Sequence, residues 1–357
     1  MKLTVPKTII LLLSLLAVCF VSCEKPEIPE EPQTTPVEEV SRGIYVLCEG
    51  VFNMNNSSLI FYDFDKGTTT NAFLAANKRG LGDTGNDLKI YGSKMYCVVN
   101  NSETVEIMDV QTAKSIKQIS LSRRQPRYIT FDAGFAYVCC FDGAVVKIDT
   151  ALMEVTATVQ SDGLNPDGIC VANGKLYVSN SGGLHYPNYD NTVSVFDLAT
   201  FSLIKNITVN INPYHIAADS EGDVYVVSRG NYDDVPMTFQ RIDSQTDEVV
   251  QTFDFPVYNF AISGNLCYLY SFNWSTYEYA VRVLDVTTEQ IVKEQFIDDR
   301  TTFTCPYGIA VDPSNGDVYL TDAYYNSTNG DVFCFGSDGC LKYKFEAGIS
   351  PSCIVFK

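Results

Sequence analysis

The chain combines 357 residues with a formal net charge of -18, from 43 acidic and 25 basic side chains. An acidic surface of this size argues against binding to nucleic acid and against broad contact with anionic lipid. The chain is also long enough to bury most of the surface that it would expose when unfolded. We therefore expect a folded acidic body that meets a membrane only through an attached anchor.

Residues 1–22 predict a secretory signal. Lys2 and Lys7 precede an apolar run from Ile9 to Val21, which is too short to span a bilayer but fits the core of a signal peptide. The run ends at Cys23, in a sequence that resembles a bacterial lipoprotein processing site, where the cysteine becomes the acylated first residue. An ordinary cleaved signal with an incidental cysteine is the alternative.

Residues 23–42 predict a tether that belongs to no fold. Prolines recur from Pro26 to Pro36 among several glutamates, and apolar residues are few. Such a composition favours a stiff, extended chain of about 3 Å per residue. The expected organisation is a signal peptide at 1–22, an acylated cysteine with its tether at 23–42, and a folded body at 43–357.

The body repeats one unit of short strands. Apolar runs alternate with Asp, Asn and Gly turns, the period-2 pattern of half-buried antiparallel strands. Each unit opens with a Pro-x-x-Ile turn or a counterpart of it, at spacings from about 39 to about 49 residues, the range of a four-stranded propeller blade. The counterparts are Asp87–Ile90, Pro126–Ile129, Pro166–Ile169, Pro213–Ile216, Val257–Phe260, Pro306–Ile309 and Pro351–Ile354.

The two ends of the body complete each other. Counting units gives six full blades, one strand at the carboxyl end (Ser352 to Phe356), and three strands at the start (Ile44 to Leu47, Ser58 to Asp63 and Thr69 to Phe73). Pairing these ends makes a seventh blade and closes a ring, which removes the exposed strand edges of an open array. We therefore predict an all-β, seven-bladed β-propeller of four-stranded antiparallel blades.

Cysteines in the body predict buried thiols. The chain has twelve cysteines but no C-x-x-C pair and only two histidines, so neither a disulfide framework nor a zinc site is expected. Most of them replace an apolar residue within a strand, as Cys97 and Cys267 do. A bridge between Cys334 and Cys340 across a hairpin is the alternative.

Enzyme motifs are absent from the sequence. There is no G-x-S-x-G, H-E-x-x-H or Walker pattern, so we predict neither an enzyme nor a cofactor. A glycosidase needs two carboxylates that face each other across a pocket, and a ring of blades brings many aspartates near its axis. A propeller lyase or hydrolase therefore remains an alternative.

Aromatic, Asn and Arg residues concentrate in the loops that a propeller places on one face, around its central channel. Tyr and Trp offer rigid contact area with a polar tip, and Asn offers both donors and acceptors, so this set predicts a concave site for a large neutral ligand. For single residues, turn geometry is the competing explanation. The expected contacts are Asn53, Asn101, Arg127, Tyr128, Tyr186, Tyr189, Arg229, Tyr232, Trp274, Tyr277, Tyr324 and Tyr325.

Several segments carry a resemblance to a known family. They are Ile44–Gly50, Ser58–Asp63, Leu81–Asp83 with Asn86-Asp87, Val98–Ser102, Pro126–Ile129 and Pro306–Asp322. The chain resembles the YncE-like (DUF5074) propeller lipoproteins of Bacteroides-type bacteria, and within that group the BtuG-type surface proteins, although Cys48 stands where Asn is expected. The resemblance implies a lipid-anchored protein on the outer face of the outer membrane, which captures cobalamin and passes it to a TonB-dependent transporter.

A corrinoid ligand agrees with the composition of the loops. It is a flat macrocycle ringed with amides, so Tyr and Trp would cover its faces while Asn, Ser and Arg bond its amides and phosphate. His185 is a candidate ligand of the cobalt, against the plainer interpretation of a surface histidine. The same loops would also suit a glycan-binding surface lipoprotein, or a protein that docks onto a partner chain.

Overall fold

The computed structural model describes residues 42–273 and 276–357. The expected signal peptide, Cys23 with its expected acylation, nearly all of the expected tether and the expected contact Trp274 lie outside these residues. Within the described part of the chain, no helix is long and apolar enough to cross a bilayer.

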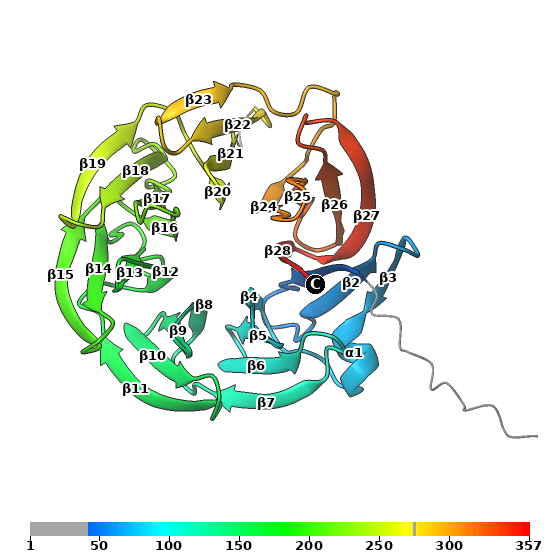
Figure 1. The fold of residues 1–357 in the computed structure, drawn as a ribbon, viewed down its shortest axis with the longest axis horizontal. Helices are drawn as coiled ribbons and strands as arrows, with labels where there is room; N and C mark the ends of the chain where they lie inside the picture. Colours follow the sequence, from blue (N-terminus) through cyan, green and yellow to red (C-terminus); the bar gives the residue numbers. More distant parts are fainter. Residues whose placement is uncertain (1–41, 274–275) are drawn as a thin grey trace, which may run out of the picture. The chain divides into compact units, whose positions relative to one another are not determined.

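The described residues form seven four-stranded antiparallel sheets arranged as the blades of a ring (Figure 1). The strands closest to the axis are β4 (Gly85–Tyr91), β8 (Pro126–Asp132), β12 (Pro166–Ala172), β16 (Pro213–Ala218), β20 (Asn259–Ser263), β24 (Pro306–Val311) and β28 (Pro351–Phe356). The second strands are β5 (Lys94–Val99), β9 (Phe135–Cys140), β13 (Lys175–Asn180), β17 (Val224–Ser228), β21 (Leu266–Phe272), β25 (Val318–Asp322) and β1 (Gly43–Cys48).

The outer half of each blade follows the same order. The third strands are β6 (Thr104–Asp109), β10 (Ala144–Asp149), β14 (Thr192–Asp197), β18 (Thr238–Asp243), β22 (Tyr279–Asp285), β26 (Asn329–Phe335) and β2 (Ser58–Asp63). The outermost strands are β7 (Ser115–Ser120), β11 (Glu154–Gln160), β15 (Ser202–Thr208), β19 (Glu248–Phe253), β23 (Gln290–Lys293), β27 (Leu341–Ile349) and β3 (Thr68–Asn71).

The two ends of the body share one blade, which confirms the predicted closure. Strand β28 pairs antiparallel with β1, with Ile354 opposite Val46, and the blade runs β28-β1-β2-β3. The Lys357 N–H also donates to the Gly43 carbonyl. The predicted strand from Thr69 to Phe73 is wrong in its second half: β3 ends at Asn71, and Phe73 lies in the short helix α1 (Ala72–Asn77). Phe73 is fully buried, so the helix packs it against the neighbouring blade.

The Pro-x-x-Ile segments are not the turns that their sequence predicts but the beginnings of the innermost strands. Between Pro and Ile the pairing with the second strand shifts register, for example between Pro126 and Ile129. Such a bulge re-aims the intervening side chains. In the first blade the equivalent segment is Gly85–Leu88 rather than Asp87–Ile90, because Gly85 pairs with the last residue of its second strand as Pro126 does.

Each second strand carries a buried tyrosine at the same position. These are Tyr45, Tyr96, Tyr137, Tyr177, Tyr225, Tyr268 and Tyr319. Some of their hydroxyls reach the outer turn of the next blade: Tyr45 donates to the Val110 carbonyl at 2.9 Å, and Tyr177 donates to the Asp247 carboxylate at 2.5 Å. A buried hydroxyl with a partner avoids a desolvation penalty, so this repeated residue ties neighbouring blades together.

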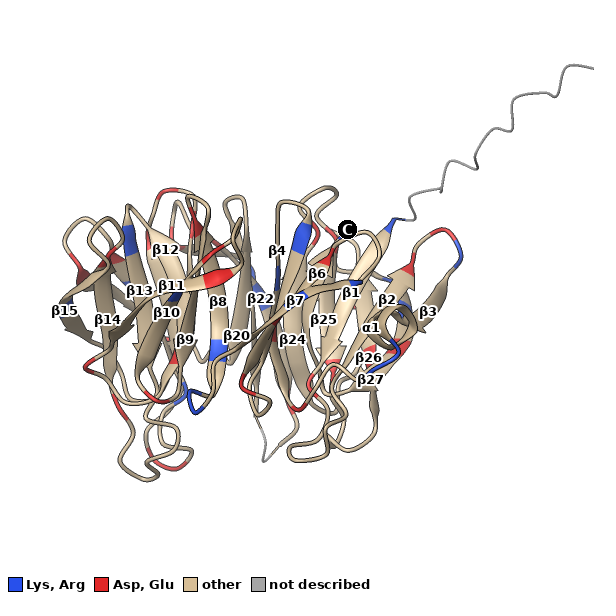
Figure 2. Ribbon diagram, turned by 90° about the horizontal axis from the view of Figure 1, so that it is seen from below, with Lys and Arg blue, Asp and Glu red and all other residues tan. Residues whose placement is uncertain are grey.

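The two faces of the disc differ (Figure 2). Connections from second to third strands and from outermost to innermost strands lie on one face, which we call the loop face. Turns such as Asp132–Phe135 and Asp149–Glu154 lie on the opposite, short-turn face. Because β1 begins and β28 ends on the short-turn face, Gly43 and Lys357 lie away from the loop face.

Thiols in the described residues are free, and eight of these ten cysteines are buried. This confirms the prediction that they act as small apolar residues. Burial raises the pKa of the Cys48 thiol to about 12. Cys334 is buried and Cys340 is exposed, and no bridge joins them, so the alternative of a hairpin disulfide is wrong.

A substitution at Leu47 tests the packing of the closing blade. It is fully buried in the cluster between the closing blade and the blade of β4 to β7. We expect Leu47→Ala to lower the free energy of unfolding by about 2 to 5 kcal/mol, because it removes buried methyl groups and leaves a cavity. Urea unfolding followed by circular dichroism measures the change. Leu152→Ala, at an exposed turn, should change stability by less than about 0.5 kcal/mol, and equal effects of the two variants would contradict the packing.

Candidate binding site at the channel mouth

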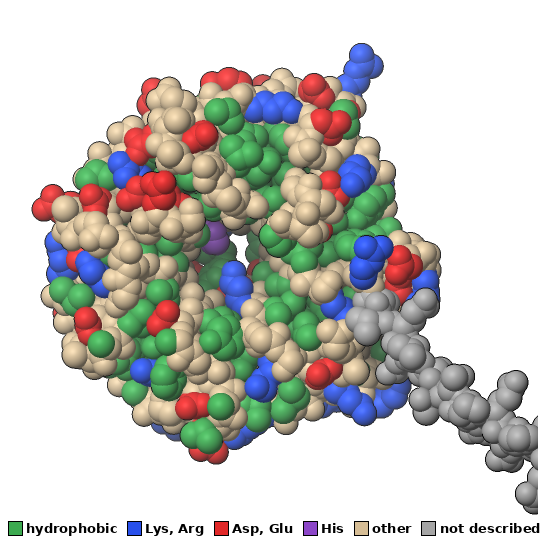
Figure 3. Space-filling view, in the orientation of Figure 1, with side chains coloured by type: hydrophobic (Ala, Val, Ile, Leu, Met, Phe, Trp, Pro, Cys, Tyr) green, Lys and Arg blue, Asp and Glu red, His purple; other side chains and the backbone are tan. Residues whose placement is uncertain are grey.

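The bulges at the starts of the innermost strands build the mouth of the central channel on the loop face. The second residue of each segment forms one tier: Asn86, Arg127, Asp167, Tyr214, Tyr258, Tyr307 and Ser352. Tyr258 is the exception to the bulge, because it precedes β20, which pairs with β21 without a register shift. The third residue adds Asp87, Tyr128, His215, Asn259 and Cys353 to the wall. The channel encloses about 510 Å³, and the opening at the centre of the disc in Figure 3 is its other end, on the short-turn face.

Close approach of the innermost strands requires a glycine at the third position in some blades. A Cβ atom on Gly168 would lie 2.3 Å from the Tyr214 carbonyl of the next blade. Its amide donates to Ser179, whose hydroxyl lies within hydrogen-bonding distance of that same carbonyl. Gly168 therefore contributes no side chain to the mouth.

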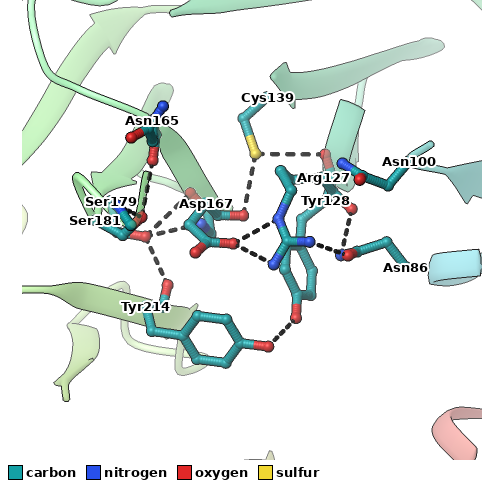
Figure 4. Close-up of polar contacts among 12 residues, drawn as sticks. Asn86, Asn100, Arg127, Tyr128, Cys139, Asn165, Asp167, Ser179, Ser181 and Tyr214 are labelled. Carbon is teal, nitrogen blue, oxygen red and sulfur yellow. Dashed lines mark hydrogen bonds and ion pairs between the residues drawn. The ribbon is translucent and has the colours of Figure 1, made fainter. Parts of the chain in front are cut away.

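Arg127 is held by its neighbours on both sides (Figure 4). Its guanidinium forms an ion pair with Asp167 of the following blade at 2.8 Å and donates to the Asn86 amide oxygen of the preceding blade. Asn86 donates in return to the Arg127 carbonyl at 2.8 Å. Since its charge is already neutralised, Arg127 joins three blades and has little capacity left for a ligand.

Tyr128 extends this network across the channel. Its hydroxyl forms a 2.6 Å hydrogen bond with the hydroxyl of Tyr214, which lies two blades away (Figure 4). The two rings meet edge to face at 6.0 Å. Burial raises the pKa of both phenols, so they remain neutral and can donate or accept a hydrogen bond.

Arg229 occupies a different environment, at the end of β17. The Cζ atom of its guanidinium lies 3.5 Å from the centre of the Tyr214 ring and 4.5 Å from the centre of the Tyr258 ring. Its Nε atom is buried and has no hydrogen-bond partner among the residues that the structure describes. Arg229 is therefore held by aromatic faces, and it lines the channel without a hydrogen-bond partner for its Nε atom among the described residues.

Glu49 faces this group of side chains from the end of β1. It accepts a 2.9 Å hydrogen bond from the Tyr307 hydroxyl. Burial raises the pKa of its carboxyl group to about 7, while the Tyr307 hydrogen bond and the charges of Arg127 and Arg229 oppose this rise. Glu49 thus changes charge near neutral pH.

Deeper in the channel the wall becomes apolar. Burial and the nearby positive charges of Lys89 and Arg229 lower the pKa of His215 to about 3, so this histidine is neutral. Below it the channel is lined by Phe131, Val171, Ile262, Val311 and Phe356. Lys89 and Thr130 are the polar residues of this deeper wall, so most of the polar side chains of the channel lie at the mouth.

Three of the predicted tyrosines form a chain on the rim of the loop face, which we call the rim chain. The centre of the Tyr189 ring lies 6.0 Å from that of Tyr186 and 6.1 Å from that of Tyr232, and both pairs are edge to face. Tyr186 and Tyr232 are 74% and 60% exposed. Tyr232 and Arg229 also line a neighbouring cavity of about 700 Å³. The rim chain thus leads to Arg229 at the channel mouth.

The other predicted contacts are spread around the loop face. The Asn101 side-chain amide donates to the Asn53 side-chain oxygen at 3.0 Å. Both residues lie beside Asp83, whose carboxylate accepts a hydrogen bond from the Asn53 backbone N–H. Tyr277 and Tyr325 are exposed, whereas Tyr324 donates to Asp331. They do not join the rim chain. His185 is exposed and hydrogen-bonds with the Asn165 side chain.

Several residues of the mouth were not predicted from the sequence as contacts. These are Glu49, Tyr214, His215, Tyr258 and Tyr307. For Tyr214, His215 and Tyr307 the signal was present in the Pro-x-x-Ile segments, because a bulge at that point turns the residues between Pro and Ile toward the axis. Glu49 follows β1, and Tyr258 precedes β20, so neither is explained by such a bulge. Interpreting the segments as turns hid this consequence.

No group of three or more His, Cys, Asp or Glu side chains suited to a metal ion occurs in the described parts of the chain. The carboxylates nearest the mouth already have partners. Asp167 pairs with Arg127, and Asp87 accepts the backbone amides of Leu88 and Ile129. Recognition at the mouth therefore depends on Arg229, Glu49 and the phenols.

Comparison with known proteins places this architecture in a family. The model of the domain of unknown function DUF5074 matches residues 42–337. The chain belongs to the DUF5074 family. No curated protein matches it.

Solved structures similar to this DUF5074 propeller share its fold at low sequence identity. A quinonprotein alcohol dehydrogenase-like protein from Bacteroides thetaiotaomicron is 16% identical with a TM-score of 0.67, covering 89% of this chain and 78% of its own. Kuenenia stuttgartiensis hydrazine synthase is 17% identical with a TM-score of 0.59, covering 73% and 86%. A chain of the mitotic checkpoint complex is 12% identical with a TM-score of 0.57, covering 73% and 79%. These similarities establish the fold alone.

A substitution at Tyr307 tests why the pKa of Glu49 is raised. Removing its hydroxyl in Tyr307→Phe takes away a donor that favours the carboxylate, so the pKa of Glu49 should rise further above its value of about 7. A carbon-detected NMR titration of the glutamate carboxyl signals measures it. Tyr325→Phe, at an exposed loop site, is the matched control and should leave the titration unchanged. A Glu49 signal that titrates near pH 4.5 in the native protein would contradict burial as the cause.

Proposed function

We propose that this DUF5074 propeller is a ligand-capture protein that binds a corrinoid across the loop face, with cobalamin as the expected ligand. The observation that carries the proposal is the rim chain of Tyr186, Tyr189 and Tyr232, which leads to Arg229 at the channel mouth. Exposed aromatic side chains that touch one another form a contiguous patch, and such patches mark binding sites.

The chemistry of the site suits a flat, amide-bearing ligand. Phenol rings can cover the face of a macrocycle, and their hydroxyls can bond amide groups at its edge. Asn53 and Asn101 add amide donors and acceptors on the far side of the ring. Neutral phenols and amides recognise such a ligand without a large desolvation cost.

The position of the termini supports capture at a surface. Gly43 lies on the short-turn face, so an anchor that precedes it would leave the loop face directed away from the point of attachment. In the proposed setting, acylated Cys23 holds the protein on the outer face of the outer membrane. The bound corrinoid then passes to a TonB-dependent transporter, as the resemblance to BtuG-type proteins implies.

Glycans are the second candidate ligand, and the exposed tyrosines favour them. Aromatic platforms also stack on sugar rings, but an uncharged polysaccharide would bring no counter-charge to Arg229. A glycan array read alongside corrinoid binding separates the two candidates.

An enzymatic alternative has one favourable observation, the raised pKa of Glu49. A glycosidase would need a second free carboxylate facing it, but Asp87 and Asp167 are engaged in hydrogen bonds and an ion pair. Binding is therefore the function that the geometry supports best.

Isothermal titration with cyanocobalamin tests the proposal. We expect saturable binding at micromolar protein, and Tyr232→Ala should weaken it by about 1 to 3 kcal/mol because a stacked aromatic ring is lost. Leu152→Ala removes an exposed apolar side chain from the opposite face and should leave the affinity unchanged. Absence of heat and of any spectral change with the native protein would refute corrinoid binding.

A further inference from the structure

We propose that Arg229 and Glu49 form a proton-controlled site for an anionic group at the channel mouth, in which Arg229 binds the anion and ionised Glu49 opposes it. The inference deepens the proposed function and rests on the same binding site, since it assigns the position of the ligand's charged group. The chemical class is a phosphate, sulfate or carboxylate.

Arg229 differs from the other arginines near the mouth. Arg127 pairs with Asp167, and Arg124 pairs with Asp142 at 3.0 Å. The backbone N–H of Arg229 donates to the Asn212 carbonyl, but no hydrogen bond or ion pair of its guanidinium is found among the described residues, and its buried Nε atom has no partner there. A buried cationic donor without a partner is costly, and an anion from a ligand would remove that cost.

The surroundings of Arg229 fix it in place without neutralising it. Tyr214 and Tyr258 cover the guanidinium with their rings at 3.5 Å and 4.5 Å. Such stacking restricts the side chain while its N–H groups stay available for a planar, bidentate contact. Arg229 lines both the channel and the neighbouring 700 Å³ cavity, so a ligand on the rim chain can reach it.

Glu49 is the acidic side chain that opposes an anion at this place. It lines the same channel and lies within electrostatic range of both Arg127 and Arg229. When neutral, it leaves the charge of Arg229 uncompensated. When ionised, it attracts Arg229 and repels an incoming anion, so anion affinity should fall as the pH rises through about 7.

Several titratable and charged groups face Glu49 from the surrounding strands. Burial raises the pKa of the Tyr128, Tyr214, Tyr258 and Tyr307 phenols, and raises that of the Cys353 thiol to about 12. His215 has a pKa of about 3, and Asp87 raises the pKa of Lys89. The remaining neighbours are Arg127, which pairs with Asp167; Asp87, which accepts two backbone amides; and the Ser352 hydroxyl.

Sulfate is a suitable probe, because it is a dianion throughout the range from pH 6 to pH 8. We expect isothermal titration with sodium sulfate, at constant ionic strength, to give an association constant about tenfold larger at pH 6 than at pH 8. The factor follows because Glu49 loses one proton with a pKa of about 7, and the carboxylate that remains blocks anion binding. The fraction of protein with neutral Glu49 is therefore about tenfold larger at pH 6 than at pH 8. Affinity that is independent of pH in the native protein would overturn the proposal.

Two variants separate the roles of the residues. Glu49→Gln should bind sulfate at pH 8 as tightly as the native protein does at pH 6, with no pH dependence. Arg229→Gln should lose sulfate binding at every pH, whereas Arg124→Gln, at an ion-paired arginine of the same face, should behave as the native protein. Near-UV circular dichroism confirms that each variant is folded. Native-like binding by a folded Arg229→Gln protein would also overturn the proposal.

The sulfate and corrinoid experiments fail independently. If cyanocobalamin does not bind but sulfate binds with the expected pH dependence, the corrinoid is wrong and the anion site stands. If cyanocobalamin binds but sulfate does not, the capture function stands and the anion site is refuted.

Discussion

The pairing of β28 with β1 is the constraint on which the rest of the molecule depends. It joins the last strand of the chain to the first strands of the body and leaves no blade of the described residues outside the ring. Only a closed ring brings seven innermost strands to one axis. The channel mouth, built from residues of every blade, exists because these two distant segments meet.

Bulges then convert the ring into a site. Where Pro126 and its counterparts begin an innermost strand, the register shift turns the next two side chains toward the axis. The same positions carry structural and functional residues side by side. Arg127 and Asp167 tie blades together, whereas Tyr214 and Tyr258 hold Arg229 by their rings and leave its charge without a carboxylate partner among the described residues.

Burial and aromatic packing, more than ion pairing, determine the charge states of Glu49 and Arg229 at the mouth. The body is strongly acidic, yet the carboxylates closest to Arg229 are engaged or, in Glu49, shifted toward neutrality by burial. An arginine held by aromatic rings and a glutamate that titrates near pH 7 form a responsive pair. Neither would have this property on an exposed loop, where water would screen the charges.

The sequence by itself determined the blades, their number and the closure, because period-2 strands, regular spacing and complementary ends are local or countable features. It also placed Tyr186, Tyr189 and Tyr232 on one face. Only the tertiary structure decided that Asp167 neutralises Arg127 while aromatic rings hold Arg229, and that Glu49 meets Tyr307 across 258 positions of the chain. Partners and burial set those properties, and both arise from segments that become neighbours only when the ring closes.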